Sequence, residues 1–360
     1  MSEALSTRLQ RKVKIAPNGH CSTALNYEHP TLGSVHVHWS KIPGVLAVVV
    51  SNDSSIISLS FRLDDNLHCA KLHQASSFGY GPEQSRHKKM IFGLAIDTLF
   101  STQPQYTQVE VPSNLQTSPN EREHFECFGS TIFRDTFYQQ QELWSVSTSA
   151  DSHSLELVNN HQSPPRPKQP IGEFYRRHIP TLHKTLSFRT IHPEQDLDLF
   201  HNWMNQRRVA KMWELDKPKA ELHQYLVERQ EDPHIFSVIG EFDGEPFGYF
   251  EIYWTKEDRL GPYYDAGDYD RGFHLLVGNT RFLGLDNFIA WFSGLTHAVF
   301  LLDRRTPRVM GEPRADNRGL LQYTQILSAY RVLKEFDFPH KRAALVECTR
   351  QRFFNQTILP

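Results

Sequence analysis

The amino-acid sequence predicts an α/β protein with a mixed sheet, divided into two domains. Three observations predict this fold class: a length of 360 residues, an alternation of strand-like and helix-like segments, and a proline-rich stretch near the middle. A domain typically has about 150 residues, so the length favours two of them. The stretch 159–170 reads NNHQSPPRPKQP, and its four prolines disfavour both helix and sheet. We expect an N-terminal α/β domain over 1–165, a connector over 166–185 and a C-terminal domain over 186–360.

The composition excludes several classes of protein. Hydrophobic residues make up 39% of the chain and charged residues 22%, which supports a sizeable core and excludes wholesale disorder. The 39 Lys and Arg against 41 Asp and Glu argue against a nucleic-acid partner. No apolar run of about 18 residues predicts a membrane span, and no secretion signal is visible. The four cysteines form no CxxC pair, so we expect a soluble cytoplasmic protein with reduced thiols.

The N-terminal half reads mainly as strands, because apolar residues alternate with polar ones or form short continuous runs. In order, the expected elements are strands 34–40, 45–51 and 56–63, a helix 89–100, a strand 107–111, a short helix 121–128 and a long strand or hairpin 133–146. His36 and His38 share one strand face, but no third residue is spaced to complete a metal site. We expect neither a metal nor a catalytic group in this half.

The C-terminal half has clearer boundaries between elements. An Asp243-Gly244 turn between two apolar runs predicts a β-hairpin, and apolar residues at helical spacing predict a helix over 286–302. In order, the expected elements are a strand 186–191, helices 193–205 and 220–229, strands 235–241, 246–254 and 272–278, a helix 286–302, a strand 308–312, a helix 318–335 and a strand 341–348. This order predicts a sheet that is antiparallel early and parallel later.

The junction between strand 272–278 and the following helix is a candidate anion site. The first N–H groups of a helix are unpaired and its dipole favours negative charge, while Gly278 and Gly284 allow close backbone approach. An ordinary strand–turn–helix corner explains the same residues. Asp286 at the expected start of the helix also competes for the N–H groups that a phosphate would need.

His274 and Asp316 are the candidate catalytic pair. His274 lies in the strand GFHLLVG, and Asp316 follows the next strand along the chain. The carboxyl ends of neighbouring strands meet at one edge of the sheet, so we expect the two side chains to converge beside the anion loop. The alternatives are a hydrogen-bonded structural histidine and an Asp316-Asn317 cap of the following helix.

Residues 186–354 resemble the Gcn5-related N-acetyltransferase superfamily, and within it the siderophore-biosynthesis branch. That branch includes aerobactin-type hydroxylysine acetyltransferases, the mycobactin lysine acyltransferase and fungal hydroxyornithine transacylases. The segments that carry the resemblance are HNWMNQRRVAKMWEL (201–215), GYFEIYWTKEDRLGPYYDAGDYDRGFHLLVG (248–278), RVMGEPRADNRG (308–319) and FPHKRAALVECTRQRF (338–353). The run 251–278 is the most specific, because it combines several short motifs in order.

The resemblance implies an acyltransferase fold that uses acetyl-CoA or another acyl-CoA as cosubstrate, without a metal. The strand around His274 would pair with the pantetheine arm, and the loop 279–284 would hold the pyrophosphate. The implied cofactor-binding residues are Leu275, Leu276, Val277, Asn279, Arg281, Gly284 and Asn317. This chain departs from the superfamily pattern at Asp286, where a small residue is usual, which puts the phosphate contacts in doubt.

The resemblance also places His274 and Asp316 on the acceptor side of the reaction. Acyl transfer to nitrogen needs a neutral amine and a base for its proton, and an N-hydroxylated amine is already neutral near pH 7. Backbone N–H groups of the strand would stabilise the oxyanion, so no protein nucleophile is required. Four further residues could bind the acceptor or serve only in packing: Glu251, Tyr253, Trp203 and Trp213.

We therefore expect acetyl transfer from acetyl-CoA to the side-chain nitrogen of N6-hydroxylysine, which forms a hydroxamate for a siderophore. N5-hydroxyornithine and a longer acyl-CoA are alternatives, since one methylene is worth only about 1–3 kcal/mol in a pocket. An ordinary amine acceptor and an inactive acyl-CoA-binding assembly protein are further alternatives. The N-terminal half repeats the element order of the C-terminal half, and is expected to be a degenerate second copy that shapes the acceptor site or a homodimer interface.

Overall fold

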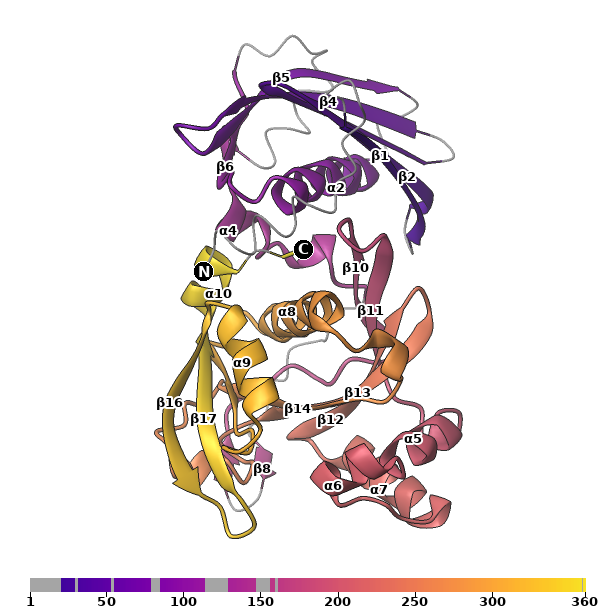
Figure 1. The fold of residues 1–360 in the computed structure, drawn as a ribbon, viewed down its shortest axis with the longest axis vertical. Coiled ribbons are helices and arrows are strands. Elements are labelled where there is room, and N and C mark those ends of the chain that lie inside the picture. Colours follow the sequence, from indigo (N-terminus) through magenta and orange to yellow (C-terminus); the bar gives the residue numbers. More distant parts are fainter. Residues whose placement is uncertain are drawn as a thin grey trace. The chain divides into compact units, whose positions relative to one another are not determined.

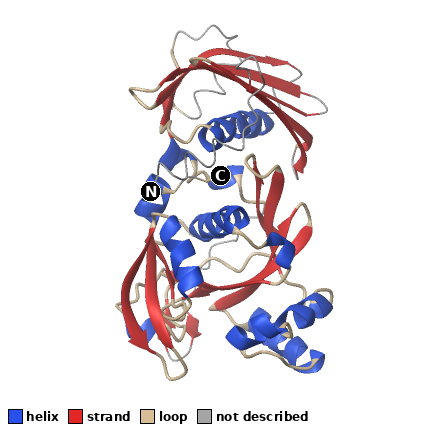
Figure 2. Ribbon diagram, viewed as in Figure 1, coloured by secondary structure: helices blue, strands red, loops and turns tan. Residues whose placement is uncertain are grey.

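The computed structural model describes residues 21–29, 32–52, 55–78, 85–113, 129–146, 156–158, 161–357 and 359–360. Contacts divide the chain into two compact units. One comprises Met1–Leu143, His178–His183 and Pro360, and the other comprises Trp144–Arg177 and Lys184–Leu359. Each unit combines a sheet with helices (Figure 1), and Figure 2 shows the two kinds of element in both. The expected α/β class with mixed sheets is confirmed.

The N-terminal unit is a seven-stranded sheet whose strands follow the order of the chain. The strands are β1 (Cys21–His29), β2 (Gly33–Ile42), β3 (Val45–Asn52), β4 (Ser55–Asp64), β5 (Cys69–Phe78), β6 (Gln108–Glu110) and β7 (Thr131–Phe133). β5 and β6 pair in parallel and are joined by α2 (Ser85–Thr102), which packs against the sheet (Figure 1). Side chains alternate between the two faces of β2, so one set is buried in this core and the other, which includes His36 and His38, is exposed.

The expected strand or hairpin over 133–146 is wrong. After β7 the chain forms the short helix α4 (Arg134–Phe137) and a 3-10 turn, η2 (Gln141–Leu143). The buried Arg134 guanidinium donates to the carbonyls of Pro104 and Tyr106, a contact distant in sequence that local aromatic content does not reveal. β1 and β5 were not expected, and the expected helix 121–128 lies outside the described residues.

The C-terminal unit is built on an eight-stranded sheet in the order β10-β11-β12-β13-β14-β15-β17-β16. Its strands are β10 (Glu173–Ile179), β11 (Lys184–Thr190), β12 (Ile235–Phe242), β13 (Glu245–Trp254), β14 (Arg271–Val277), β15 (Arg308–Gly311), β16 (Tyr330–Asp337) and β17 (Arg342–Thr349). The helices are α5 (Leu197–Met204), α6 (Arg207–Trp213), α7 (Lys219–Glu231), α8 (Leu285–Leu302), α9 (Arg318–Ile326) and α10 (Arg350–Gln356). β8 (Glu156–Val158) and β9 (His161–Ser163) form a separate pair.

The two faces of this sheet carry different helices. α8 crosses one face and connects the parallel strands β14 and β15, while α5 and α7 pack together beneath the other face (Figure 1). α8 is long and apolar enough to cross a membrane by length and composition, yet 72% of it is buried inside the fold. That burial is typical of a core helix, and it agrees with the apolar periodicity that predicts the helix.

The predicted hairpin is confirmed as β12 and β13, and its turn explains why. Asp243 and Gly244 have φ values of 53° and 76°, the two positive angles that a type I′ turn requires. Asp243 also accepts a hydrogen bond from the backbone of Thr185, which ties the turn to β11.

The expected long helix over 318–335 is wrong. α9 ends at Ile326, and the chain then forms β16, which pairs along its length with β17. Most side chains of β16 are exposed, because the strand lies at the edge of the sheet. Its charged residues are also typical of an exposed helix face, so composition alone favoured the helix. β17 therefore lies between β15 and β16 and is antiparallel to both, so the part of the sheet that was expected to be parallel is parallel only between β14 and β15.

β14 separates from β15 after two paired positions. Arg271 pairs with Val309 and Gly272 with Met310, and no further pairing follows. From Phe273 onward this side of β14 is an open edge inside the sheet. The unexpected helix α6 partly covers it, since the Trp213 indole donates to the Leu275 carbonyl at 3.3 Å and Arg208 donates to the Gly278 carbonyl at 2.8 Å.

The two units repeat one arrangement of strands and helix. In both, an 18-residue helix joins two parallel strands and an antiparallel strand follows: β5–α2–β6–β7 and β14–α8–β15–β17. The register repeats as well, since Val109 pairs with Ile132 and Val309 with Cys348. In each unit an arginine directly follows the antiparallel strand, β7 or β17. It donates to backbone carbonyls that lie just before the second parallel strand, β6 or β15. These arginines are Arg134 and Arg350.

Replacement of Gly278 by alanine is expected to destabilise the C-terminal unit. The added Cβ would lie 2.1–2.3 Å from the Trp203 indole, whose ring is buried and rigid. We expect a loss of about 2–3 kcal/mol in the free energy of unfolding, measured by urea denaturation. Gly319→Ala is the control, because its Cβ meets nothing closer than 4.0 Å and alanine favours the helix. Equal stability of the two variants would contradict the contact.

Candidate active site

The imidazole of His274 lies between two buried glutamates on neighbouring strands. Glu251 of β13 is its cross-strand partner, and their side chains meet with Nδ1 2.9 Å from Oε2. Glu312 follows β15 directly, and its Oε1 lies 3.3 Å from Nε2 of the same ring. The carboxylates are 3% exposed and the imidazole is 19% exposed, so the ring is the most solvent-accessible of these three groups.

Tyrosine hydroxyls hold the Glu251 carboxylate in place. Glu251 accepts hydrogen bonds from Tyr249 of the same strand at 2.8 Å and from Tyr225 of α7. Ser237 of β12 lies 2.8 Å from the Tyr249 hydroxyl and extends the network across the sheet. Because each oxygen of Glu251 has a partner, the carboxylate cannot rotate away from His274.

Positively charged side chains lie close to the Glu312 carboxylate. Tyr253 donates to Glu312 at 2.9 Å, Arg259 lies 3.4 Å from its Oε1, and Lys341 lies 3.6 Å from the same atom. Lys341 also donates to the Glu312 backbone carbonyl at 2.8 Å. The Arg259 side chain is 50% exposed, so part of its guanidinium faces solvent beside His274.

These contacts determine the charge of the site. Burial alone would lower the pKa of His274, but hydrogen bonds to Glu251 and Glu312 and their charges raise it to about 10. The same contacts hold the pKa of both glutamates below the usual range, although burial opposes this. At neutral pH the cluster is therefore an imidazolium between two carboxylates.

Three of the four predicted acceptor residues contact the imidazole. The Tyr253 ring lies 4.7 Å from the His274 ring, and Trp213 meets it edge-on with centroids 6.2 Å apart. Glu251 is the hydrogen-bond partner described above. Trp203 is instead buried under Gly278, where it packs against the end of β14.

Asp316 lies elsewhere in the structure. Its side chain is 72% exposed and pairs with Arg314 at 3.0 Å, while His274 takes its carboxylate partners from Glu251 and Glu312. Asn317 caps α9 by accepting from the backbone of Leu320, the role that the capping alternative gave to this pair of residues. Sequence reasoning missed Glu312 as a partner, although its place directly after a strand next to that of His274 was a signal.

The predicted donor side is a strand edge followed by a loop. Leu275 and Val277 lie on the open edge of β14, and Leu276 is buried in the core below it. The loop then turns into α8 through Gly284, whose φ of 109° favours glycine. Asn279 and Arg281 both donate to Glu245, at 3.0 and 2.7 Å, so the loop is ordered by its own side chains.

Comparisons with known proteins identify this arrangement. Residues 192–338 match the acetyltransferase (GNAT) domain. An N(6)-hydroxylysine O-acetyltransferase of Escherichia coli is 36% identical over 81% of this chain and 95% of its own length. A hydroxyornithine transacylase of Ajellomyces capsulatus is 43% identical over 90% of this chain and 72% of its own. An N(5)-hydroxyornithine:cis-anhydromevalonyl coenzyme A transacylase of Beauveria bassiana is 40% identical over 59% of this chain and 48% of its own.

The His274 imidazole is expected to stay protonated well above neutral pH. Its pKa of about 10 exceeds the value near 6.5 of an unfolded histidine, so its contribution to stability is full below about pH 6.5 and falls as pH rises towards 10. A pH titration followed by NMR of the imidazole nitrogens measures this directly. Glu312→Gln should lower the pKa of His274, since it removes one of the two charges. Titration of the wild-type ring near pH 6.5 would contradict the geometry.

Proposed function

Because this chain belongs to the GNAT acetyltransferase family, we propose that it transfers an acetyl group from acetyl-CoA to the side-chain nitrogen of N6-hydroxylysine. The product is a hydroxamate, an iron-chelating group of siderophores. The observation that carries this proposal is the His274 imidazolium, held by two carboxylates beside an open strand edge. The names of the relatives, which specify hydroxylysine or hydroxyornithine, supply the acceptor class.

The open edge of β14 is suited to binding the acyl-CoA donor. On the side that faces β15, backbone groups of β14 beyond Gly272 have no partner strand, so the pantetheine amides of acyl-CoA can pair with them as a short strand would. The first turn of α8 and the loop 279–284 then favour the pyrophosphate, because helix N-termini present free N–H groups to anions. Arg281 is 73% exposed and can turn from Glu245 towards a phosphate.

The charge of the acceptor site favours a hydroxylamine over an amine. A lysine side chain has a pKa near 10.4 and reaches the site as a cation, which has no free electron pair on nitrogen. His274, Arg259 and Lys341 set three positive charges against the carboxylates of Glu251 and Glu312, so the cluster offers a cationic amine little net attraction, whereas the neutral hydroxylamine can attack without first losing a proton. The half-exposed Arg259 guanidinium is also placed to bind the acceptor's α-carboxylate.

The reaction follows from these positions. The neutral nitrogen attacks the thioester carbonyl, and a backbone N–H of β14 stabilises the oxyanion. The C–N bond forms, the C–S bond breaks, and CoA leaves as the thiolate. As the C–N bond forms the nitrogen becomes strongly acidic, so its proton can pass to the Glu312 carboxylate despite the low pKa of that group, which His274 orients through Nε2. The Cys348 thiol has no part, because burial raises its pKa and keeps it protonated.

We also propose that the N-terminal unit is a degenerate second copy of the acyltransferase fold. His73 occupies the place of His274, since each lies three residues after the position that pairs with Val109 or Val309. His73 is exposed and contacts Arg62 instead of a carboxylate. It therefore lacks the partners that fix a charged imidazole, and this unit serves to support the catalytic one.

Release of free thiol from acetyl-CoA tests the reaction, with hydroxylysine, hydroxyornithine, lysine and ornithine as parallel acceptors. We expect rapid release only with a hydroxylated acceptor. His274→Ala and Glu312→Gln should lower kcat by about 10²- to 10⁴-fold, the range for lost acid–base groups. Asp316→Asn is the matched control, and its exposed position predicts a change of less than about threefold.

Three results would change the proposal. Faster release with hydroxyornithine, or with a longer acyl-CoA, would reassign the substrate within the same chemistry. A loss in Asp316→Asn as large as that in Glu312→Gln would restore Asp316 as the partner of His274. Bound CoA without turnover of any acceptor or acyl donor would favour an inactive binding protein.

A further inference from the structure

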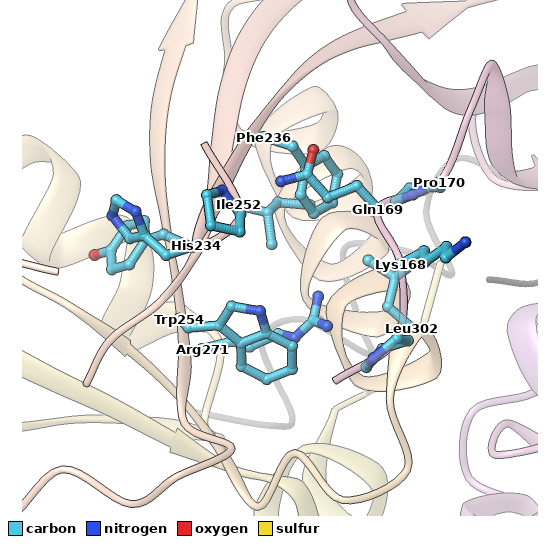
Figure 3. Close-up of a pocket in the computed structure, with 12 residues that line it drawn as sticks. Lys168, Gln169, Pro170, His234, Phe236, Ile252, Trp254, Arg271 and Leu302 are labelled. Atoms are coloured by element: carbon cyan, nitrogen blue, oxygen red, sulfur yellow. The ribbon is translucent and has the colours of Figure 1, made fainter. Parts of the chain in front are cut away.

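The proline-rich segment, residues 163–170, packs along the end of β13. Figure 3 shows Gln169 and Pro170 of this segment next to Ile252 and Trp254 of the strand, with which they line one small pocket. The Gln169 side-chain amide also donates, at 2.7 and 3.0 Å, to two backbone carbonyls at and just before the start of β12. The C-terminal end of the segment is therefore held against the sheet.

A buried ion pair joins the start of this segment to the loop between β13 and β14, residues 255–270. The Arg166 side chain is 9% exposed and lies 2.7 Å from Oε2 of Glu257, whose own side chain is fully buried. Ser163 donates to Oε1 of the same carboxylate at 2.9 Å. Arg166 also donates to the Asp268 carbonyl at 2.5 Å. One arginine of the proline-rich segment thus contacts both ends of the loop.

Glu257 and Arg259 lie two residues apart in one tight turn of this loop. The backbone N–H of Gly261 donates to the Asp258 carbonyl at 3.0 Å, and a Cβ at Gly261 would lie only 2.7 Å from two carbonyls of the same turn. Leu260 is fully buried among apolar residues of β15 and β17. Because Glu257 and Leu260 are fixed on either side, the backbone of Arg259 is held where its guanidinium reaches the acceptor site.

A second buried pair supports the same turn from β12. His234 is 7% exposed, with Nδ1 2.5 Å from Oδ1 of Asp232 and Nε2 3.9 Å from Oδ2 of Asp258. Asp258 also accepts a hydrogen bond from the backbone N–H of Leu260 at 3.0 Å. These contacts keep the turn folded when the pair with the proline-rich segment is removed. Such a removal therefore shifts Arg259 without unfolding the loop.

We propose that the Arg166–Glu257 pair positions Arg259 and so makes the enzyme selective for acceptors that carry an α-carboxylate. Neither member of the pair reaches the substrate, and both act through the guanidinium of Arg259. This inference rests on the proposed function, in which Arg259 binds the acceptor's α-carboxylate. Loss of Arg166 leaves the buried Glu257 charge without its cation, and the turn then moves to bring that carboxylate towards water.

Kinetics with two acceptors test this role. The first is N6-hydroxylysine, and the second is its decarboxylated analogue, N-hydroxy-1,5-diaminopentane, which keeps the hydroxylamine and lacks the carboxylate. In the wild-type enzyme, we expect kcat/KM for hydroxylysine to exceed that for the analogue at least about tenfold, the value of one charged hydrogen bond. Arg166→Gln should raise KM for hydroxylysine about five- to tenfold, and should leave kcat, KM for acetyl-CoA and the kinetics of the analogue unchanged.

A double-mutant cycle shows whether the pair acts through Arg259. Arg259→Gln should lower the ratio of the two kcat/KM values at least as far as Arg166→Gln does. The double variant should show no further loss, because the carboxylate contact is already absent. Arg166→Lys keeps the positive charge and should restore part of the ratio.

Arg189→Gln is the matched control. It breaks an ion pair elsewhere in the same unit, since Arg189 lies 2.7 Å from Asp196 and 2.8 Å from Glu241. It should lower the stability of the unit and leave the ratio of the two acceptors unchanged. Where Arg166→Gln does not fold, Glu257→Gln tests the same pair, because the amide keeps a contact for Ser163 and removes the buried charge.

The outcomes separate this inference from the proposed function. An unchanged ratio in Arg166→Gln together with a lower one in Arg259→Gln would overturn the role of the pair and leave the acyltransfer reaction intact. An unchanged ratio in Arg259→Gln, or an equal fall in Arg189→Gln, would overturn it as well. Absence of turnover by the wild-type enzyme with every hydroxylated acceptor would refute the proposed function and this inference with it.

Discussion

The ion cluster of Glu251, His274 and Glu312 constrains three strands at once. A buried carboxylate without a partner costs several kcal/mol, and here the His274 imidazolium pairs with both carboxylates while Arg259 and Lys341 add positive charge beside Glu312. The cluster forms only if β13 and β14 keep their register and β15 ends beside them. The hydrogen bonds of Tyr249 and Tyr253 then fix each carboxylate, so the chemistry of the site and the geometry of the sheet depend on the same contacts.

Local signals predicted much of this sheet. The Asp243-Gly244 turn, the apolar stripe of α8 and the alternation that separates His274 from Phe273 all depend on near neighbours in sequence. β16 could not be predicted in this way, because an exposed edge strand and an exposed helix face carry similar charged residues. Only the pairing with β17 decides between them.

Local sequence also could not predict which carboxylate pairs with His274. Asp316 and Glu312 both follow the strand next to His274, and sequence spacing does not say which carboxylate turns inward. The burial of Glu312 beside Tyr253 and Lys341 decides it, through contacts from distant parts of the chain. The repeated role of Arg134 and Arg350 was hidden for a similar reason, since both bind carbonyls remote in sequence.

The open edge of β14 also bears on self-association. Unpaired strand edges recruit strands from other molecules and promote aggregation when they lie at the rim of a sheet. This edge is inside the sheet, flanked by β15 and partly covered by Trp213 and Arg208. A strand of another molecule would have to enter between β14 and β15, inside the sheet, to pair with this edge. The same feature that leaves backbone groups free therefore restricts which molecules can reach them.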